Sequence, residues 1–207
     1  LSVTMSGVLC VVLVSRRSNW NYLIGTYNVI GYSYLAYQWG LGGDFMLNAF
    51  YFLPMQFIGL YMWTKNLENG AIVKSRSLSN KSFVKLLIVS LITIGIYTVA
   101  LKDIIAPFFN SLNLAVSFPL YESYSLYIMD SISTVLSVIA MWLMAKRYSQ
   151  QWDLWIIVNV ASIGMWTLAI INSTSDIGNA VAMILMWSMY LANALYGRYN
   201  WKKTARN

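Results

Sequence analysis

Long runs of apolar residues constrain this chain more than any other feature of its sequence. Six stretches of mostly apolar residues follow one another, at about 20–39, 44–63, 82–101, 122–145, 152–172 and 177–199. A helix needs about 20 such residues to cross the hydrocarbon core of a bilayer. The stretches therefore predict membrane-spanning helices, and a shorter run at about 3–14 predicts one more.

The first run, at about 3–14, is too short for a full span. Because the chain begins with Leu1 and not with Met, we expect this helix to be truncated. A cleaved signal peptide is the competing interpretation, but the basic pair Arg16-Arg17 follows the run and no small-residue cleavage site does. The sequence thus predicts an all-α integral membrane protein with seven transmembrane helices.

Composition narrows the classes of function. The chain has 207 residues, of which 58% are hydrophobic and 10% charged, with no histidine and a single cysteine, Cys10. An internal disulfide, a zinc or haem site with histidine ligands, and a Ser-His-Asp triad are therefore excluded. The predicted spans contain neither a nucleophile–base pair nor paired carboxylates, so we predict that the protein has no catalytic residue. We also predict no metal and no cofactor. The net charge of +7 does not indicate nucleic-acid binding, because the charges lie in short clusters between apolar runs.

The basic clusters predict the orientation. Alternate connections between the runs hold nearly all the Lys and Arg: Arg16, Arg17, Lys65, Lys74, Arg76, Lys81, Lys85, Lys146, Arg147, Arg198, Lys202, Lys203 and Arg206. Cytoplasmic loops of membrane proteins carry such an excess of basic residues. We therefore expect these connections and the C-terminus in the cytoplasm, and the N-terminus outside.

Two parts of the chain resemble each other. With an offset of 130, Arg16-Arg17 aligns with Lys146-Arg147, and with an offset of 138 the pattern Gly-x-Tyr-x-Trp-x-Lys at 59–65 aligns with the same pattern at 197–203. Chance alignment of apolar helices with basic ends is the alternative. A repeat is a signal of duplicated architecture. We interpret it as two three-helix repeats, at 1–65 and 122–207.

The segment between the repeats, 66–121, then joins them and sets their relative orientation. It contains a cytoplasmic loop, a linker helix at about 82–101 and an extracytoplasmic loop. Because each repeat has an odd number of helices, a directly following second repeat would be inverted in the membrane relative to the first. A linker helix between them restores the parallel orientation. The predicted 3+1+3 arrangement, with two parallel three-helix repeats, is a transporter architecture whose substrate lies between the halves near the midplane.

Polar side chains inside spans are costly, which makes them functional candidates. Asp130 is the one carboxylate well inside a predicted span, and Thr134 lies one turn further along. A structural hydrogen bond between helices is the alternative for Asp130. Trp152, Trp155 and Asn159 are spaced i, i+3, i+7, so two indoles and an amide share a helix face. Such a face suits a flat, polar-edged ring, with cation–π attraction if the ring is cationic; an interfacial anchor is the alternative for the tryptophans.

Further amides lie within the spans. These are Asn28, Asn48, Gln56 and Asn193. Pro54 precedes Gln56 by two residues and should kink the helix at about 44–63.

Three motifs carry a family resemblance. Gln151-Trp152-x-x-Trp155-x-x-x-Asn159 resembles a signature of bacterial nicotinamide riboside transporters, the PnuC family. The run from Asp44 through Asn48, Tyr51, Gln56 and Gly59 to Trp63, and the ending Asn193-Ala-x-x-Gly197-x-x-x-Trp201, also resemble that family. The resemblance extends from about 4 to 203.

The resemblance implies a function. It implies a fold similar to the sugar-transporting SWEET proteins, in the inner (plasma) membrane of a bacterium, and facilitated diffusion of nicotinamide riboside by alternating access. A separate cytoplasmic riboside kinase would trap the product. The substrate would be bound by Trp152, Trp155, Asn159, Asn193, Gln56, Asn48 and Asp130.

Several alternatives remain at this point. Related frameworks carry thiamine or riboflavin, and Asp130 could couple transport to protons. A membrane protein without a solute site is a third reading. The sequence leaves the oligomeric state open, a homo-oligomer included.

Overall fold

The computed structural model describes residues 2–68, 72–117, 123–172 and 176–204. The chain forms α1 (Ser2–Ser15), α2 (Trp20–Gln38), α3 (Gly42–Leu47), the π-helix η1 (Asn48–Phe52), α4 (Leu53–Thr64), β1 (Leu67–Glu68), β2 (Ile72–Val73), α5 (Asn80–Ala100), the π-helix η2 (Leu101–Ile105), α6 (Ala106–Ser111), α7 (Tyr124–Ala145), α8 (Gln151–Ile171) and α9 (Ile177–Thr204). The two short strands pair in an antiparallel hairpin.

Within the described residues, five helical stretches are long and apolar enough to cross a membrane. They are Gly42–Thr64, Asn80–Ser111, Tyr124–Ala145, Gln151–Ile171 and Ile177–Thr204. The prediction of an all-helical protein with membrane-spanning helices is therefore confirmed. The finer count of seven spans stays a prediction, because α1 is a shorter apolar helix of 14 residues and α2 is not among the five.

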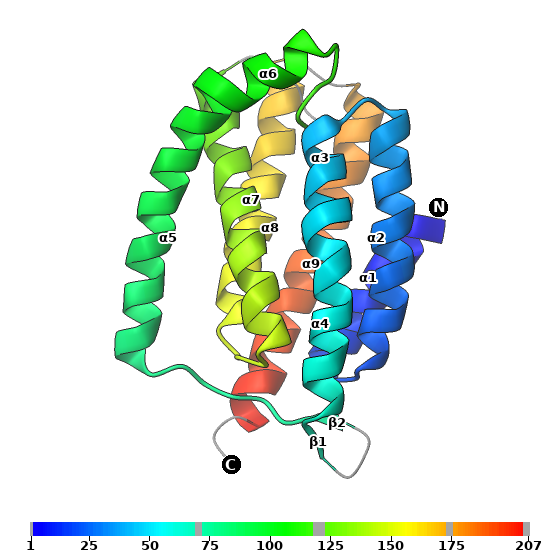
Figure 1. Ribbon diagram of the computed structural model, residues 1–207, viewed down its shortest axis with the longest axis vertical. Coiled ribbons are helices and arrows are strands. Elements are labelled where there is room, and N and C mark those ends of the chain that lie inside the picture. The colour runs from blue at the N-terminus through cyan, green and yellow to red at the C-terminus, as the bar shows by residue number, and fades with distance from the viewer. Residues whose placement is uncertain (1, 69–71, 118–122, 173–175, 205–207) are drawn as a thin grey trace.

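The long helices stand side by side (Figure 1). We call α1–α4 the first helix group and α7–α9 the second. The groups meet where α1 packs against α9 and α4 packs against α7, and α5 packs on α7 from outside. We call one end of this bundle the basic end: it holds the turns 16–19 and 146–150, the segments 65–68 and 72–79, and the end of α9 (Figure 1).

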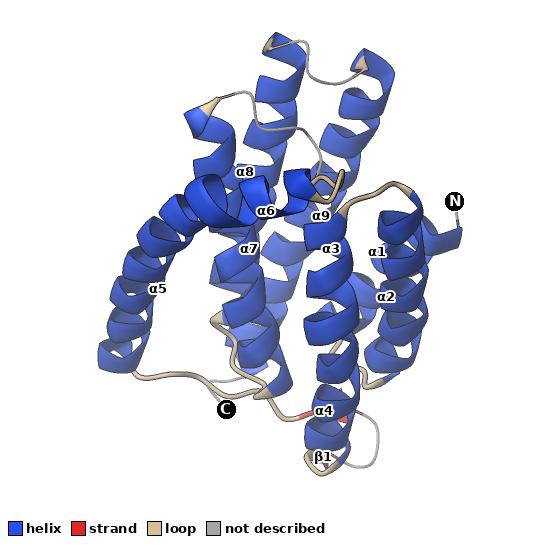
Figure 2. Cartoon of the chain, turned by 45° about the horizontal axis from the view of Figure 1, so that its top comes forward, coloured by secondary structure: helices blue, strands red, loops and turns tan. Residues whose placement is uncertain are grey.

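The opposite end of the bundle is crossed by α6. The structure extends the linker beyond the predicted helix at about 82–101, because η2 and α6 continue it to Ser111. Figure 2, with the top of the molecule turned forward, shows α6 running from α5 toward α3. Gly42 allows this approach, since a β-carbon there would collide with the ring of Phe109. Residues 102–111, for which the sequence predicts an extracytoplasmic connection, are thus helical.

Both π-helical segments end two residues before a proline. Pro54 and Pro107 lie in the first turn of the α-helices that follow η1 and η2. Proline lacks the N–H that a continuous helix would need, and a wider π-helical turn accommodates the break in the hydrogen-bond pattern. The distortion that the sequence predicts at Pro54 is thus a π-helical segment within the stretch Gly42–Thr64.

An aromatic cluster fills the basic end. We call Tyr22, Trp63, Trp152 and Trp201 the aromatic quartet; each is at most 2% exposed. Ring centroids lie 5.1 Å apart for Tyr22 and Trp63, 5.7 Å for Trp63 and Trp201, and 6.1 Å for Trp152 and Trp201. The quartet joins both helix groups in one core.

Two indole hydrogen bonds cross between the helix groups. Trp63 Nε1 of α4 donates to the Met144 carbonyl of α7 at 2.8 Å. Trp201 Nε1 of α9 donates to the Val14 carbonyl of α1 at 3.0 Å. A buried indole N–H needs such a partner, so these bonds fix how the two groups meet.

Candidate functional site

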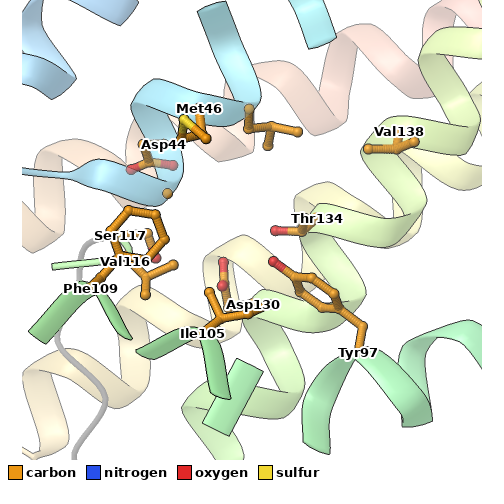
Figure 3. A pocket seen from close by; sticks show the side chains of 12 residues that line it. Asp44, Met46, Tyr97, Ile105, Phe109, Val116, Ser117, Asp130, Thr134 and Val138 are labelled. Carbon is orange, nitrogen blue, oxygen red and sulfur yellow. The ribbon is translucent and has the colours of Figure 1, made fainter. Parts of the chain in front are cut away.

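A cavity of about 370 Å³ lies near the ends of α3 and α7 that are opposite the basic end. Its wall combines side chains from both helix groups and from the linker helices, as Figure 3 shows. The polar part of the wall comes from Asp44, Tyr97, Ser117, Asp130 and Thr134. Ligand sites are commonly such concave, mostly apolar spaces with a few polar groups.

Two carboxylates face this cavity from different helix groups. Asp44 belongs to α3 and Asp130 to α7, and Figure 3 shows both directed into the space between the helices. The Tyr32 hydroxyl donates to Asp44 Oδ2 at 3.5 Å, and the backbone N–H of Asp44 donates to the Val116 carbonyl at 2.9 Å. Asp130 is 7% exposed. The arrangement favours a cationic ligand, because charges interact strongly in a poorly solvated space.

The structure brings Asp130 and Thr134 together on the cavity, as their i, i+4 spacing predicts. Asp44 is not among the predicted site residues, and the sequence places it at the very start of the predicted span at about 44–63. The structure places it in the first turn of α3. Its spacing of four residues before Asn48 is the signal that could have identified it, since i and i+4 lie on one helix face.

The predicted tryptophan pair of α8 divides between two environments. Trp152 is 2% exposed, belongs to the aromatic quartet and packs on Gly197. Trp155 is half-buried and contacts both the core around the quartet and the core beneath α5. Neither indole lines the cavity of Asp130. The helix face that the sequence predicts for Trp152 and Trp155 therefore packs, near the basic end, against other helices and not against the cavity.

Two predicted side chains are buried with unused hydrogen-bonding groups. Asn159 is 3% exposed, and its amide makes no side-chain hydrogen bond within the described part of the chain. Gln56 is 6% exposed, and its Oε1 has no partner among the described residues. A buried polar atom without a partner costs free energy and needs an explanation. A polar ligand between the helix groups would supply one.

The other two predicted amides have local partners. Asn48 Nδ2 donates to the Asp44 carbonyl at 2.9 Å, within its own helix. Asn193 Nδ2 donates to the Val11 carbonyl at 3.0 Å and thereby ties α9 to α1. These contacts give both residues a structural task, and of the seven predicted side chains Asp130 is the one that lines the cavity.

Comparison with known proteins gives one consistent family. The family model described as nicotinamide mononucleotide transporter matches residues 1–203. The nicotinamide riboside transporter PnuC of Neisseria mucosa is 30% identical over 98% of this chain and 71% of its own length. The protein of the same name from Haemophilus influenzae is 33% identical over 98% of this chain and 78% of its own. A crystal structure of the vitamin B3 transporter PnuC has a TM-score of 0.75 and 30% identity, and the match covers 99% of this chain and 80% of that one.

Proposed function

We propose, from the premise that this chain belongs to the nicotinamide mononucleotide transporter family, that it takes up nicotinamide riboside across a membrane. The chain is a membrane transporter and not an enzyme, in line with its family and its relatives. The family model is described by the mononucleotide and the curated relatives by the riboside. The carboxylates of Asp44 and Asp130 in the cavity wall favour the cationic riboside over the mononucleotide. This observation carries the proposal.

The charges of the two candidate substrates differ. Nicotinamide riboside carries one positive charge on its pyridinium ring. The mononucleotide adds a phosphate of about −1.5 to −2 at neutral pH. A cavity with Asp44 on one side and Asp130 on the other attracts the cation and repels the phosphate. We therefore assign the riboside, and not the mononucleotide, to this cavity.

The deeper part of the binding path is assigned to α8 and α4. Trp155 would stack on the cationic ring, and Asn159 and Gln56 would meet the carboxamide or ribose from opposite helix groups. The buried Gln56 Oε1, which has no partner among the described residues, and the Asn159 amide, which makes no side-chain hydrogen bond there, support this assignment. Trp152 would close the path at the basic end, and Asn48 and Asn193 would hold the surrounding helices.

The proposed architecture is the 3+1+3 arrangement. Its repeats are 1–65 and 122–207, and the segment 66–121 joins them. The reciprocal indole bonds of Trp63 and Trp201 support it, since the two tryptophans occupy the same position of the repeated pattern Gly-x-Tyr-x-Trp-x-Lys. Arg17 and Arg147, which the repeat aligns, share a left-handed backbone with φ of 61° and 66°.

The orientation follows from charge. We propose that the basic end faces the cytoplasm of a bacterium and that the cavity of Asp44 and Asp130 faces outward. The chain would work by facilitated diffusion, and a cytoplasmic riboside kinase would trap the product. Proton coupling through Asp130 is the second candidate, favoured by the position of that carboxylate on the cavity. Outside acidification of proteoliposomes would then stimulate uptake.

The function is tested by calorimetric titration of the detergent-purified protein. The ligands are nicotinamide riboside, its mononucleotide, nicotinamide, thiamine and riboflavin. Saturable binding of the riboside with rejection of the mononucleotide is the expected result. Binding of thiamine or riboflavin alone would keep the fold and contradict the substrate.

The carboxylates make a separate prediction. Asp44→Asn and Asp130→Asn should each weaken riboside binding about tenfold, equal to about 1.4 kcal/mol, because each removes a negative charge facing the cation. Both should weaken discrimination against the mononucleotide. Asp103→Asn is the matched control, since Asp103 has an exposed side chain near the same end and pairs with Lys102. Equal affinities in all three variants would remove the cavity from the substrate path.

A further inference from the structure

A segment of chain with two buried residues crosses the basic end. We call residues 72–78 the strap; it begins with β2 and leads toward α5 across the base of the bundle (Figure 1). Val73 is 0% exposed and Ser75 is 6% exposed. Lys74, Arg76 and Ser77 are exposed. Connecting segments usually run over the surface, so the burial of Val73 and Ser75 within this one has a packing reason.

The first part of the strap is held by the first helix group. The backbone N–H of Val73 donates to the Arg17 carbonyl at 3.0 Å, and Arg17 Nη1 donates to the Val73 carbonyl at 3.4 Å. The N–H of Lys74 donates to the Asn66 carbonyl at 3.1 Å. The Val73 side chain packs in the core of the aromatic quartet. This part of the strap is therefore fixed by both backbone bonds and apolar burial.

The second part is held by the turn between α7 and α8. The N–H of Arg76 donates to the Arg147 carbonyl at 2.8 Å, and the N–H of Ser149 donates to the Arg76 carbonyl at 2.8 Å. Gln150 Oε1 accepts from the Leu78 N–H at 3.0 Å, and Gln150 Nε2 donates to the Leu78 carbonyl at 3.1 Å. The strap is thus bound to the second helix group by hydrogen bonds of main chain and amide.

A further contact reaches the end of α9. Ser75 Oγ and Thr204 Oγ1 lie 3.3 Å apart. One residue separates Val73, which the first helix group holds, from Ser75, which the second holds. Two residue steps of extended chain span at most about 7 Å. While both contacts persist, the helix groups cannot move apart at the basic end.

We propose that the strap is a latch that keeps the basic end closed and releases the second helix group, at the α7–α8 turn and at the end of α9, when the transporter opens toward that end. This inference rests on the proposed function, because alternating access requires such an opening. The strap is expected to separate from the second helix group and not from the first. Val73 is anchored in the core at the first contact, whereas the bonds of Arg76 and Gln150 join loop segments.

Electrostatics act on this contact in both directions. Burial, and then the neighbouring charge of Arg76, lower the pKa of Arg147 from its ordinary value. Repulsion between the two guanidinium groups offsets part of the hydrogen bonding between the strap and the turn. Arg147 Nη1 also donates to the Lys74 carbonyl at 3.1 Å, and Arg76 lies over the Tyr148 ring, which adds to the hold of the turn on the strap.

A reversible cross-link tests the latch. Cys10 is the one native cysteine, so Cys10→Ser gives a background for the pair Ser75→Cys and Thr204→Cys. After oxidation, riboside uptake into proteoliposomes should fall at least tenfold, while riboside binding persists and a reductant restores uptake. Each single-cysteine variant should transport normally under oxidation. Unchanged uptake by protein shown to be cross-linked would overturn the latch. Absence of riboside binding and uptake in the reduced protein would instead contradict the proposed function.

A second variant weakens the latch without a cross-link. Gln150→Ala removes the amide that holds Leu78, whereas Gln38→Ala makes the same change at an exposed position at the other end of α2. The reporter is Val14→Cys in the Cys10→Ser background, because Val14 is 3% exposed within the quartet core. In inside-out vesicles, an impermeant maleimide should label it at least fivefold faster with Gln150→Ala and at the unchanged rate with Gln38→Ala. Equal labelling in both variants would contradict the latch.

Discussion

Asn159→Ala is expected to weaken nicotinamide riboside binding about 10- to 100-fold, with little change in the melting temperature of the protein. Asn159 is 3% exposed, and its amide makes no side-chain hydrogen bond within the described residues. Its removal therefore costs the folded protein no internal bond, whereas a bound carboxamide or hydroxyl loses its partner, at about 1–3 kcal/mol. Calorimetric titration with the riboside and a thermal melt of the same samples measure the two effects.

Asn179→Ala is the matched control for this substitution, because Asn179 is an exposed asparagine near the start of α9. Trp155→Ala should also weaken binding, but it should lower stability as well, since Trp155 packs against two cores. A riboside affinity that is unchanged in both Asn159→Ala and Trp155→Ala would remove the α8 face from the site.

Gly197→Ala is expected to destabilise the protein and to lower transport. A β-carbon at Gly197 would lie 2.5 Å from a ring carbon of Trp152, which is 2% exposed. The indole would have to leave the aromatic quartet, and overpacking of this kind costs about 1–3 kcal/mol. For a chain of this size that corresponds to a melting temperature lower by about 2–12 °C.

Gly95→Ala is the control for the glycine substitution. A β-carbon at Gly95 would meet no atom within 4 Å. Alanine is also the better helix former, so this variant should be at least as stable as the parent. A melting temperature that is the same for Gly197→Ala and Gly95→Ala would contradict the tight packing at the basic end.

Helix positions were predictable because each depends on a local apolar run. The run at about 82–101 corresponds to α5 at Asn80–Ala100, and the run at about 152–172 corresponds to α8 at Gln151–Ile171. The continuation of the linker through η2 and α6 escaped prediction. Pro107 and the charged pair before it resemble a loop, and the π-helical turn that accommodates them depends on packing across the end of the bundle.

The candidate site was predictable in part. The polar positions of Asp130 and Asn159 follow from the cost of polar groups inside a span. The role of Trp152 did not follow, because its indole meets Trp201 only after the chain has folded. Sequence spacing gives the face of one helix, and the partner of that face comes from helices far along the chain. The strap escaped prediction for the same reason, since its polar sequence is typical of a solvated loop.

The crossed indole bonds have a consequence for this architecture. Each helix group supplies one indole N–H that donates to a carbonyl of the other group. Each of these carbonyls lies in the last turn of the first helix of its group, Val14 in α1 and Met144 in α7. Reciprocal contact, in which one surface meets a copy of itself, is the mark of an isologous interface in a two-fold dimer. The internal contact of this single chain has the form of a subunit interface. On the proposed two-repeat architecture, a single three-helix unit that paired with a copy of itself in parallel would make both bonds.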